Sequence, residues 1–366
     1  MERIASLLDI KTTDSTKTIL DYVEKSTIDN PIDSNTIKRL FKKNNNSLYE
    51  RFLTWLVLLE IYPCCSDQWL FHLGKINSNY WSFVRDFGLT DWEKRSIPHH
   101  FPSENYGLDN NPTMSLIHGD LVRTGRLLFC LGEKIIPGSQ QESDDDKIYF
   151  FQEHVRRLER VLYVYAMVNP GFGYLQGFNE LVVPFYYVSL SSLSIYSDIN
   201  IIEAITFQLF FQVMTKTRLN EFYTTQDKSS IILHQLNPFI ELQKVHLPDQ
   251  ARIIQDLNIH PIFYCLRWFT LLFAQEYEME FLIQIWDVLF FHFNEMMEYA
   301  FYIGLGQINY VKNALDHKSY QKTITSLQKL KIEGDITPVL NFAQKCWNED
   351  HPPESFFSFL KRKLFS

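Results

Sequence analysis

Residues 148–171 read IYFFQEHVRRLERVLYVYAMVNPG and contain the clearest helical pattern in the chain. Apolar residues recur three and four positions apart, which places them on one face of an α-helix. This apolar stripe consists of Ile148, Phe151, Val155, Leu158, Leu162 and Tyr165. Arg156, Arg157 and Arg160 fall outside the stripe. Pro170 predicts the end of the helix, because proline disfavours helical geometry in the residue before it.

The same period recurs towards the C-terminus. It predicts helices over 261–273, 280–291 and 296–311, with Trp268 and Trp286 packed in the core. Alternating strand patterns with hairpin turns are hard to find, and only 13 of 366 residues are glycine. The predicted fold class is therefore all-α.

Composition limits the classes of function. Hydrophobic residues make up 46% and charged residues 21%, which excludes wholesale disorder. A net charge of −8 without a long basic stripe argues against nucleic-acid binding. Five cysteines, an odd number without zinc-type spacing, favour a reducing compartment. No secretory or membrane-spanning segment is evident, so we expect a cytoplasmic protein.

Polar stretches divide the chain. The first 45 residues predict one or two short helices and a linker, and residues 137–147 carry the triplet Asp144-Asp145-Asp146, which predicts a solvated loop. Nucleotide-binding motifs are missing. Residues 171–177 have glycines at the wrong spacing for a dinucleotide loop, and no phosphate-binding Gly-Lys-Ser/Thr loop occurs, so we expect no nucleotide hydrolysis by the chain alone.

Two polar segments interrupt the apolar helices. In the first, 117–125, Asp120 and Arg123 are three residues apart, so the carboxylate can hold the guanidinium on a final helical turn. In the second, 173–180, flanking glycines leave the Gln176 amide accessible to a partner. Taken alone, these patterns are more typical of a surface salt bridge and a polar turn.

Taken together, these motifs resemble a known family. Ile117-x-x-Asp120-x-x-Arg123 and Tyr174-x-Gln176-Gly177 resemble the two finger motifs of the TBC domain, found in GTPase-activating proteins for Rab GTPases. Arg51-x-x-x-Trp55 resembles the family's first motif, and residues 266–276 and 285–290 resemble its Arg-Trp and Trp-Asp helices. The motifs occur in the family's order from about residue 45 onwards. Phe178 departs from the family's usual Met, an apolar change of tolerable volume.

The resemblance implies a mechanism and a site. Arg123 would act as an arginine finger, and Gln176 as a glutamine finger that orients the attacking water. Asp120 would hold Arg123, while Tyr174 and Gly177 would shape the turn that carries Gln176. Arg51 would brace the same site, and a purely structural salt bridge explains Arg51 equally well.

The resemblance also implies a partner and an architecture. The partner would be a GTP-bound Rab-family small GTPase that carries GTP and Mg²⁺ itself, so the chain needs no cofactor or metal of its own. A role in vesicle trafficking and peripheral association with endomembranes through partners would follow. The expected organisation is a two-lobed TBC helical domain with a central groove: an N-terminal segment 1–45, a lobe 46–219 that carries both fingers, and a lobe 220–366.

Two other interpretations stay open. The chain would instead be a catalytically silent module with a TBC fold that binds a Rab or another protein. The aromatic and basic residues at 356–365 suggest direct membrane binding, although a terminal helix that covers the core explains them as well.

Overall fold

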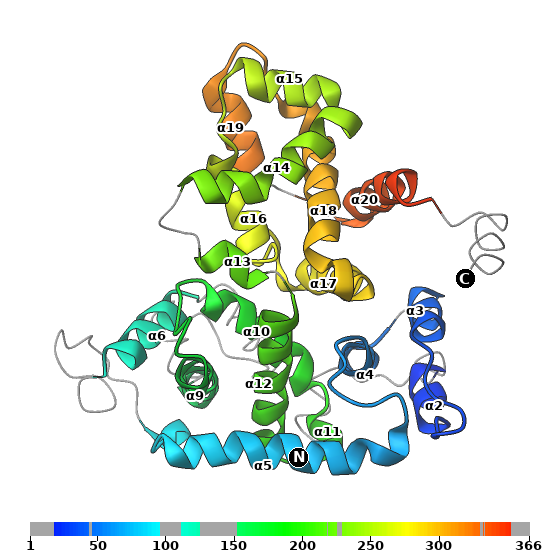
Figure 1. Ribbon diagram of the computed structural model, residues 1–366, viewed down its shortest axis with the longest axis vertical. Helices are drawn as coiled ribbons and strands as arrows, with labels where there is room; N and C mark the ends of the chain where they lie inside the picture. Colours follow the sequence, from blue (N-terminus) through cyan, green and yellow to red (C-terminus); the bar gives the residue numbers. More distant parts are fainter. Residues whose placement is uncertain are drawn as a thin grey trace, which may run out of the picture. The chain divides into compact units, whose positions relative to one another are not determined.

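The computed structural model describes residues 18–43, 46–95, 111–124, 152–217, 219–224, 229–329, 332 and 334–352 (Figure 1). The acidic loop at 137–147 and the aromatic and basic segment at 356–365 lie outside these residues, as do Ile148 and Phe151 of the predicted apolar stripe. Within the described ranges no strand occurs, which confirms the all-α prediction. The α-helices are α2 (Thr18–Glu24), α3 (Ser34–Lys43), α4 (Leu48–Leu58), α5 (Trp69–Asp86), α6 (Pro112–Arg123), α9 (Gln152–Val168), α10 (Phe178–Leu190), α11 (Leu193–Tyr196), α12 (Ile199–Lys216), α13 (Leu219–Thr224), α14 (Ser229–His246), α15 (Pro248–Asp256), α16 (Leu266–Thr270), α17 (Met279–Phe291), α18 (Met296–Val311), α19 (Tyr320–Gln328) and α20 (Thr337–Asp350). Short 3₁₀ turns are η2 (Ser66–Gln68), η3 (Trp92–Lys94), η4 (Pro261–Phe263), η5 (Phe293–Glu295) and η6 (Lys312–Ala314).

The described residues fall into two compact units. The first unit lies within Met1–Thr224 and Glu278–Phe293, and the second within Thr225–Tyr277 and Asn294–Ser366. Helix α17 thus belongs with the N-terminal helices, although it falls within the predicted lobe 220–366.

The helix predictions differ in accuracy. Helices α9, α17 and α18 lie where the hydrophobic period placed them. The predicted helix over 261–273 is wrong as a continuous element: it is divided into η4 and the short α16. The chain then turns through left-handed φ values of 44° at Leu272 and 66° at Phe273. Both side chains are fully buried, so tertiary packing holds a backbone conformation that apolar residues rarely adopt.

The core of the first unit surrounds α10, which contacts α12, α9, α6, α4 and α17. Trp55 of α4 and Phe185 of α10 meet Trp286 and Phe290 of α17, with ring centroids 4.7–6.1 Å apart. Trp286 is completely buried, as predicted. Aromatic pairs of this kind fix α17 against α4 and α10.

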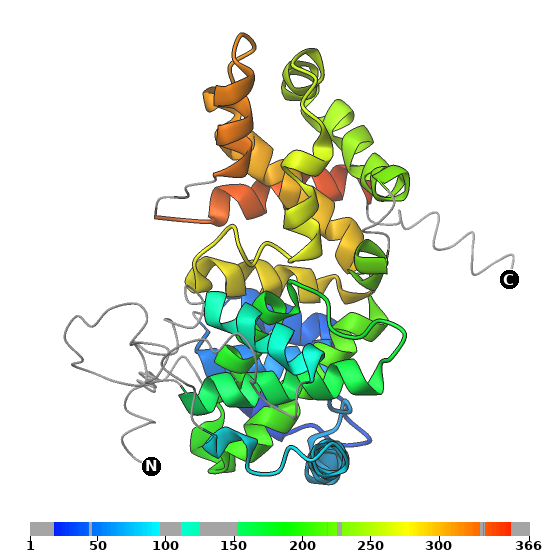
Figure 2. The ribbon, with the colours of Figure 1, turned by 90° about the vertical axis from the view of Figure 1, so that its left-hand side faces the viewer.

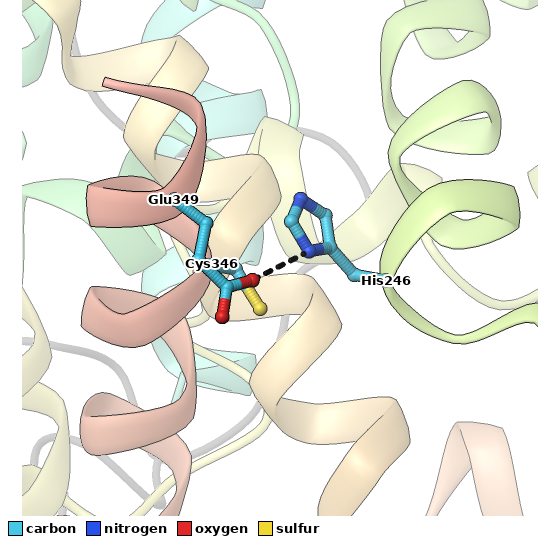
Figure 3. A group of neighbouring side chains, drawn as sticks. All are labelled: His246, Cys346 and Glu349. Atoms are coloured by element: carbon cyan, nitrogen blue, oxygen red, sulfur yellow. Dashed lines mark ion pairs between the residues drawn. The ribbon is translucent and has the colours of Figure 1, made fainter. Parts of the chain in front are cut away.

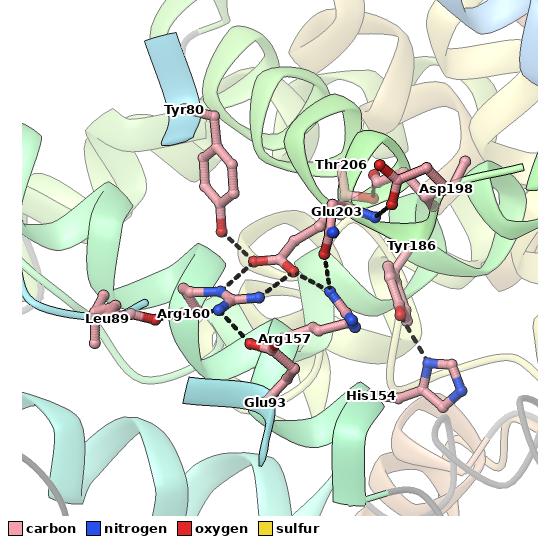
Figure 4. Close-up of polar contacts among 12 residues, drawn as sticks. Tyr80, Leu89, Glu93, His154, Arg157, Arg160, Tyr186, Asp198, Glu203 and Thr206 are labelled. Carbon is pink, nitrogen blue, oxygen red and sulfur yellow. Dashed lines mark hydrogen bonds and ion pairs between the residues drawn. The ribbon is translucent and has the colours of Figure 1, made fainter. Parts of the chain in front are cut away.

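The arginines of α9 are buried, although they fall outside its apolar stripe. Figure 4 shows Glu203 of α12 between Arg157 and Arg160, with Tyr80 of α5 donating to the same carboxylate. Arg160 is completely buried and also donates to Glu93 at 2.6 Å. A 3.6-residue period separates apolar from polar positions, and here the polar positions form an internal ion-pair network because buried charges require partners.

Helix α5 contacts α12 and α9. It crosses the lower edge of Figure 1 and is seen end-on in Figure 2, where it is the blue helix at the lower edge. Its first turn exposes Leu70 and Phe71. Neither α5 nor any other helix in the described ranges is long and apolar enough to cross a membrane.

The second unit is organised around α18 and α20. Gly306 of α18 sits so close to Val339 of α20 that an added Cβ would lie 2.3 Å from the Val339 carbonyl oxygen. Trp268, predicted as a core residue, is completely buried in this unit. Arg267 forms an ion pair at 2.6 Å with Glu276 across the turn that follows α16.

Candidate functional site

Helix α6 has a defined start and a firmly anchored inner face. Asn111 caps its N-terminus by accepting from the amides of Thr113 and Met114, and its own side-chain NH₂ donates to Tyr163 of α9 at 2.8 Å. On the inner face, the imidazole of His118 meets the carboxylate of Glu159 of α9. Both side chains are buried, so this contact fixes the rotation of α6 and thereby the direction of its last turn.

Arg123 is the last residue of α6 and is held by a buried acid. Its guanidinium donates to Asp120, whose side chain is 3% exposed, whereas the Arg123 side chain is 67% exposed. The guanidinium runs back along the helix, since a Cβ at Gly119 would lie 3.9 Å from both of its terminal nitrogens. The guanidinium of Arg123 is therefore held by Asp120, and the side chain remains accessible to a partner.

Tyr174 holds the other oxygen of the same acid. Its hydroxyl donates to Asp120 Oδ2 at 2.9 Å. Burial and the neighbouring carboxylate raise the pKa of Tyr174 well above its ordinary value, so the hydroxyl keeps its proton and remains a donor. Asp120 thus accepts from Arg123 and Tyr174 on separate oxygens and joins the two motifs.

Gln176 lies in a turn that depends on two glycines. Gly173 and Gly177 have φ values of 64° and 107°, a region that favours glycine. The Gln176 side chain is exposed, while the residues around it are anchored. Phe178 packs its ring against Tyr174 and Tyr223, with centroids 5.9 and 4.9 Å apart. The larger side chain at the family's usual Met position therefore contributes to the core below the turn.

Asn179 links the two segments and is not among the site residues predicted from the sequence. Its side-chain oxygen accepts from the Gly177 amide at 3.1 Å, and its NH₂ donates to Thr124 Oγ1 at 2.6 Å and to the Asp120 carbonyl at 3.3 Å. Asn179 is 5% exposed. The usual local signal for such an Asn is an Asx-turn, in which its side chain accepts from the amide two residues later, whereas Asn179 accepts from the amide two residues earlier. The long-range bonds to α6 had no such signal.

Arg51 has a different environment. Its Nε lies 2.8 and 2.9 Å from the two carboxylate oxygens of Asp287, and Trp55 Nε1 donates to the same acid at 2.8 Å. Burial raises the pKa of Asp287 to about 6, and the charge of Arg51 opposes that rise. Within the described part of the chain, the side-chain hydrogen bonds of Arg51 go to this acid and not to Asp120 or Gln176. Its position favours the structural alternative.

Comparison with known proteins identifies the family. The Rab-GTPase-TBC domain matches residues 100–315. A TBC domain-containing protein of Schizosaccharomyces pombe, C1952.17c, is 36% identical over 135 residues, which are 37% of this chain and 22% of that protein. Human TBC1 domain family member 13 is 28% identical over 194 residues, 53% of this chain and 48% of that protein.

Two further similarities extend over more of the chain. The GTPase-activating protein GYP7 of Saccharomyces cerevisiae is 24% identical over 286 residues, 72% of this chain and 35% of that protein. The crystal structure of the Ypt/Rab-GAP domain of Gyp1p covers 91% of this chain and 99% of its own, with a TM-score of 0.66 and 19% identity, a likeness of fold. The chain thus aligns with less than half the length of each of these three sequence relatives. Since the family matches well over half of this chain, the protein belongs to the Rab-GTPase-TBC domain family.

Proposed function

We propose that this protein is a GTPase-activating protein for a Rab-family small GTPase, with Arg123 as its arginine finger and Gln176 as its glutamine finger. The observation that carries the proposal is the hydrogen-bonded link between the two segments. Asp120 accepts hydrogen bonds from both Arg123 and Tyr174, while the side chains of Arg123 and Gln176 stay exposed.

The chemistry of GTP hydrolysis matches these two side chains. The transition state spreads negative charge over the phosphate oxygens, and a water must attack in line with the leaving group. An exposed guanidinium can neutralise that charge, and an exposed amide can orient the water. Neither group needs to change protonation state. GTP and Mg²⁺ would be carried by the Rab, so this chain would supply no cofactor.

The buried residues hold Arg123 and the turn that carries Gln176 in place before the partner binds. A long arginine side chain loses conformational entropy when it is fixed, and part of that cost is met before binding by Asp120. Since the two segments are bonded to each other through Asp120, Tyr174 and Asn179, both fingers would enter the nucleotide site as one rigid surface. The site of action would be at endomembranes, reached through the Rab partner.

The decisive experiment measures phosphate release from a panel of GTP-loaded Rab proteins, with and without the purified chain. We expect stimulation of at least one Rab and loss of that stimulation in the double variant Arg123→Ala, Gln176→Ala. The matched control replaces Arg252 and Gln255 of α15 by Ala, since both are exposed and lie in the second unit. If no Rab is stimulated although Rab binding is measurable, the proposal fails in favour of a catalytically silent binding module.

A further inference from the structure

The second unit contains a cluster of metal-ligating side chains that plays no part in the proposed GTPase chemistry. His246 is the last residue of α14, and Cys346 and Glu349 lie three residues apart on α20. One ligand atom from each lies within 4.8 Å of the other two. Figure 3 shows the imidazole of His246 directed at Cys346 and Glu349 from the opposing helix.

The spacing of these atoms suits a small divalent ion. His246 Nδ1 lies 3.5 Å from a Glu349 carboxylate oxygen. Two ligands bound to zinc at about 2.1 Å in tetrahedral geometry are about 3.4 Å apart, so this pair already has the required separation. Because Cys346 and Glu349 are on one face of α20, their side chains need only rotamer adjustments to close around an ion.

A second layer of contacts orients the imidazole. Asp350 Oδ2 lies 2.7 Å from His246 Nε2 and accepts a second hydrogen bond, at 2.8 Å, from the Tyr302 hydroxyl. An imidazole with its proton on Nε2 would donate to Asp350 and turn the lone pair of Nδ1 towards Glu349. A carboxylate behind the distal nitrogen of a ligating histidine is the usual arrangement in metal sites.

The charges favour a cation between these groups. A lone pair on Nδ1 and a carboxylate oxygen at 3.5 Å repel each other, and a bound cation turns that repulsion into attraction. The alternative is a doubly protonated imidazole that pairs with Glu349 and Asp350 without any metal. Cys346 favours the cation, because the residue is 2% exposed and its sulfur lies within 4.8 Å of the ligand atoms of His246 and Glu349.

We propose that His246, Cys346 and Glu349 bind a zinc-class divalent cation, with Asp350 as the positioning residue for His246 and water in the fourth position. Nitrogen, sulfur and oxygen donors together match zinc or cobalt better than magnesium or calcium, which prefer oxygen alone. The thiol releases its proton to solvent when its sulfur binds the ion. The ion would join the end of α14 to α20.

The test is a titration of the full, tag-free chain with Co²⁺ after treatment with a chelator. We expect one equivalent to bind with a thiolate-to-cobalt charge-transfer band, and Zn²⁺ to displace it. Cys346→Ser should abolish the band, and Asp350→Asn should weaken binding about 10–100-fold while the band remains. Cys64→Ser is the matched control, because Cys64 is an exposed free cysteine.

Two results would overturn the site. One is the lack of a charge-transfer band in the wild-type chain; the other is its retention in Cys346→Ser. Because Cys346 is buried and its replacement can impair folding, Glu349→Gln provides a second variant at an exposed position, where we expect at least about tenfold weaker binding with unchanged circular dichroism. None of these measurements depends on GTPase activation.

Discussion

The side chain of Asn179 donates a hydrogen bond of 2.6 Å to Thr124 Oγ1, which connects the start of α10 to the end of α6. The Oδ1 atom of the same side chain accepts a hydrogen bond of 3.1 Å from the backbone amide of Gly177, the residue after Gln176. The residue next to Arg123 and the residue next to Gln176 are therefore attached to one buried amide group.

Replacement of Asn179 by Ala should lower the stimulated rate of GTP hydrolysis about tenfold or more. The hydrogen bonds of the Asn179 side chain to the Gly177 amide, Thr124 and the Asp120 carbonyl are lost, and each contributes about 0.5–1.5 kcal/mol. The loss should appear mainly in kcat, because Arg123 and Gln176 remain but are no longer held together. The control is Asn313→Ala, an exposed asparagine of η6 that should leave the rate unchanged. Equal rates for both variants would exclude a positioning role for Asn179.

Arg123→Lys and Gln176→Ala should each lower stimulated hydrolysis at least about 100-fold without loss of the fold. Lysine keeps the positive charge but lacks the planar fork that contacts several phosphate oxygens. Phosphate release in single turnover is the measurement. Arg252→Lys is the matched control for charge placement, because Arg252 also pairs with an acid three residues away and is 70% exposed. Stimulation at the wild-type level by either finger variant would refute the two-finger assignment.

Arg51→Met should reduce the free energy of unfolding by about 3–5 kcal/mol. The side chains of Arg51 and Asp287 are 11% and 6% exposed, so removal of the cation leaves a buried carboxylate uncompensated. Stimulated hydrolysis per folded molecule should stay within about twofold of the wild type. Urea unfolding and the phosphate-release assay check the two parts separately. A stable variant with a large loss of stimulation would instead place Arg51 in the catalytic site.

His154 should make the protein less stable in mild acid. Burial and the charge of Arg157 lower its pKa to about 4, below the ordinary value of 6.5 (Figure 4). The unfolded chain takes up the proton first, so the stabilisation by neutral His154 is complete above pH 6.5 and is lost as pH falls towards 4. In His154→Gln the pH-dependent part of the stability that comes from His154 is absent. Urea unfolding of both proteins at several pH values should therefore show their stability difference changing within that window, and a constant difference would contradict the prediction.

Two glycine-to-alanine replacements should change stability in opposite directions. In Gly306→Ala the new Cβ would meet a backbone oxygen at 2.3 Å, so α18 and α20 must separate, at a cost of about 1–3 kcal/mol or more. In Gly74→Ala of α5 the Cβ meets nothing within 4 Å, and better helix propensity should stabilise the chain by about 0.5–1 kcal/mol. Thermal unfolding checks both, and equal shifts would refute the close approach at Gly306.

The sequence by itself determined the fold class and the placement of Arg123. Apolar residues three and four apart place α9, α17 and α18 correctly, because burial of one helix face requires that period. The spacing of Asp120 and Arg123 likewise brings them together within one helical turn. The catalytic roles of Arg123 and Gln176 are a prediction from resemblance to the family, and the phosphate-release assay tests them.

Only the tertiary structure decided which distant polar groups meet. The arginines of α9 are buried against Glu203 and Glu159 from positions that the helical period marks as polar. Arg51 pairs with an acid 236 positions away, and His246 faces α20. Helical periodicity specifies which face of an element is apolar, but hydrogen bonds and ion pairs between elements depend on how those elements pack, a non-local property that no local spacing encodes.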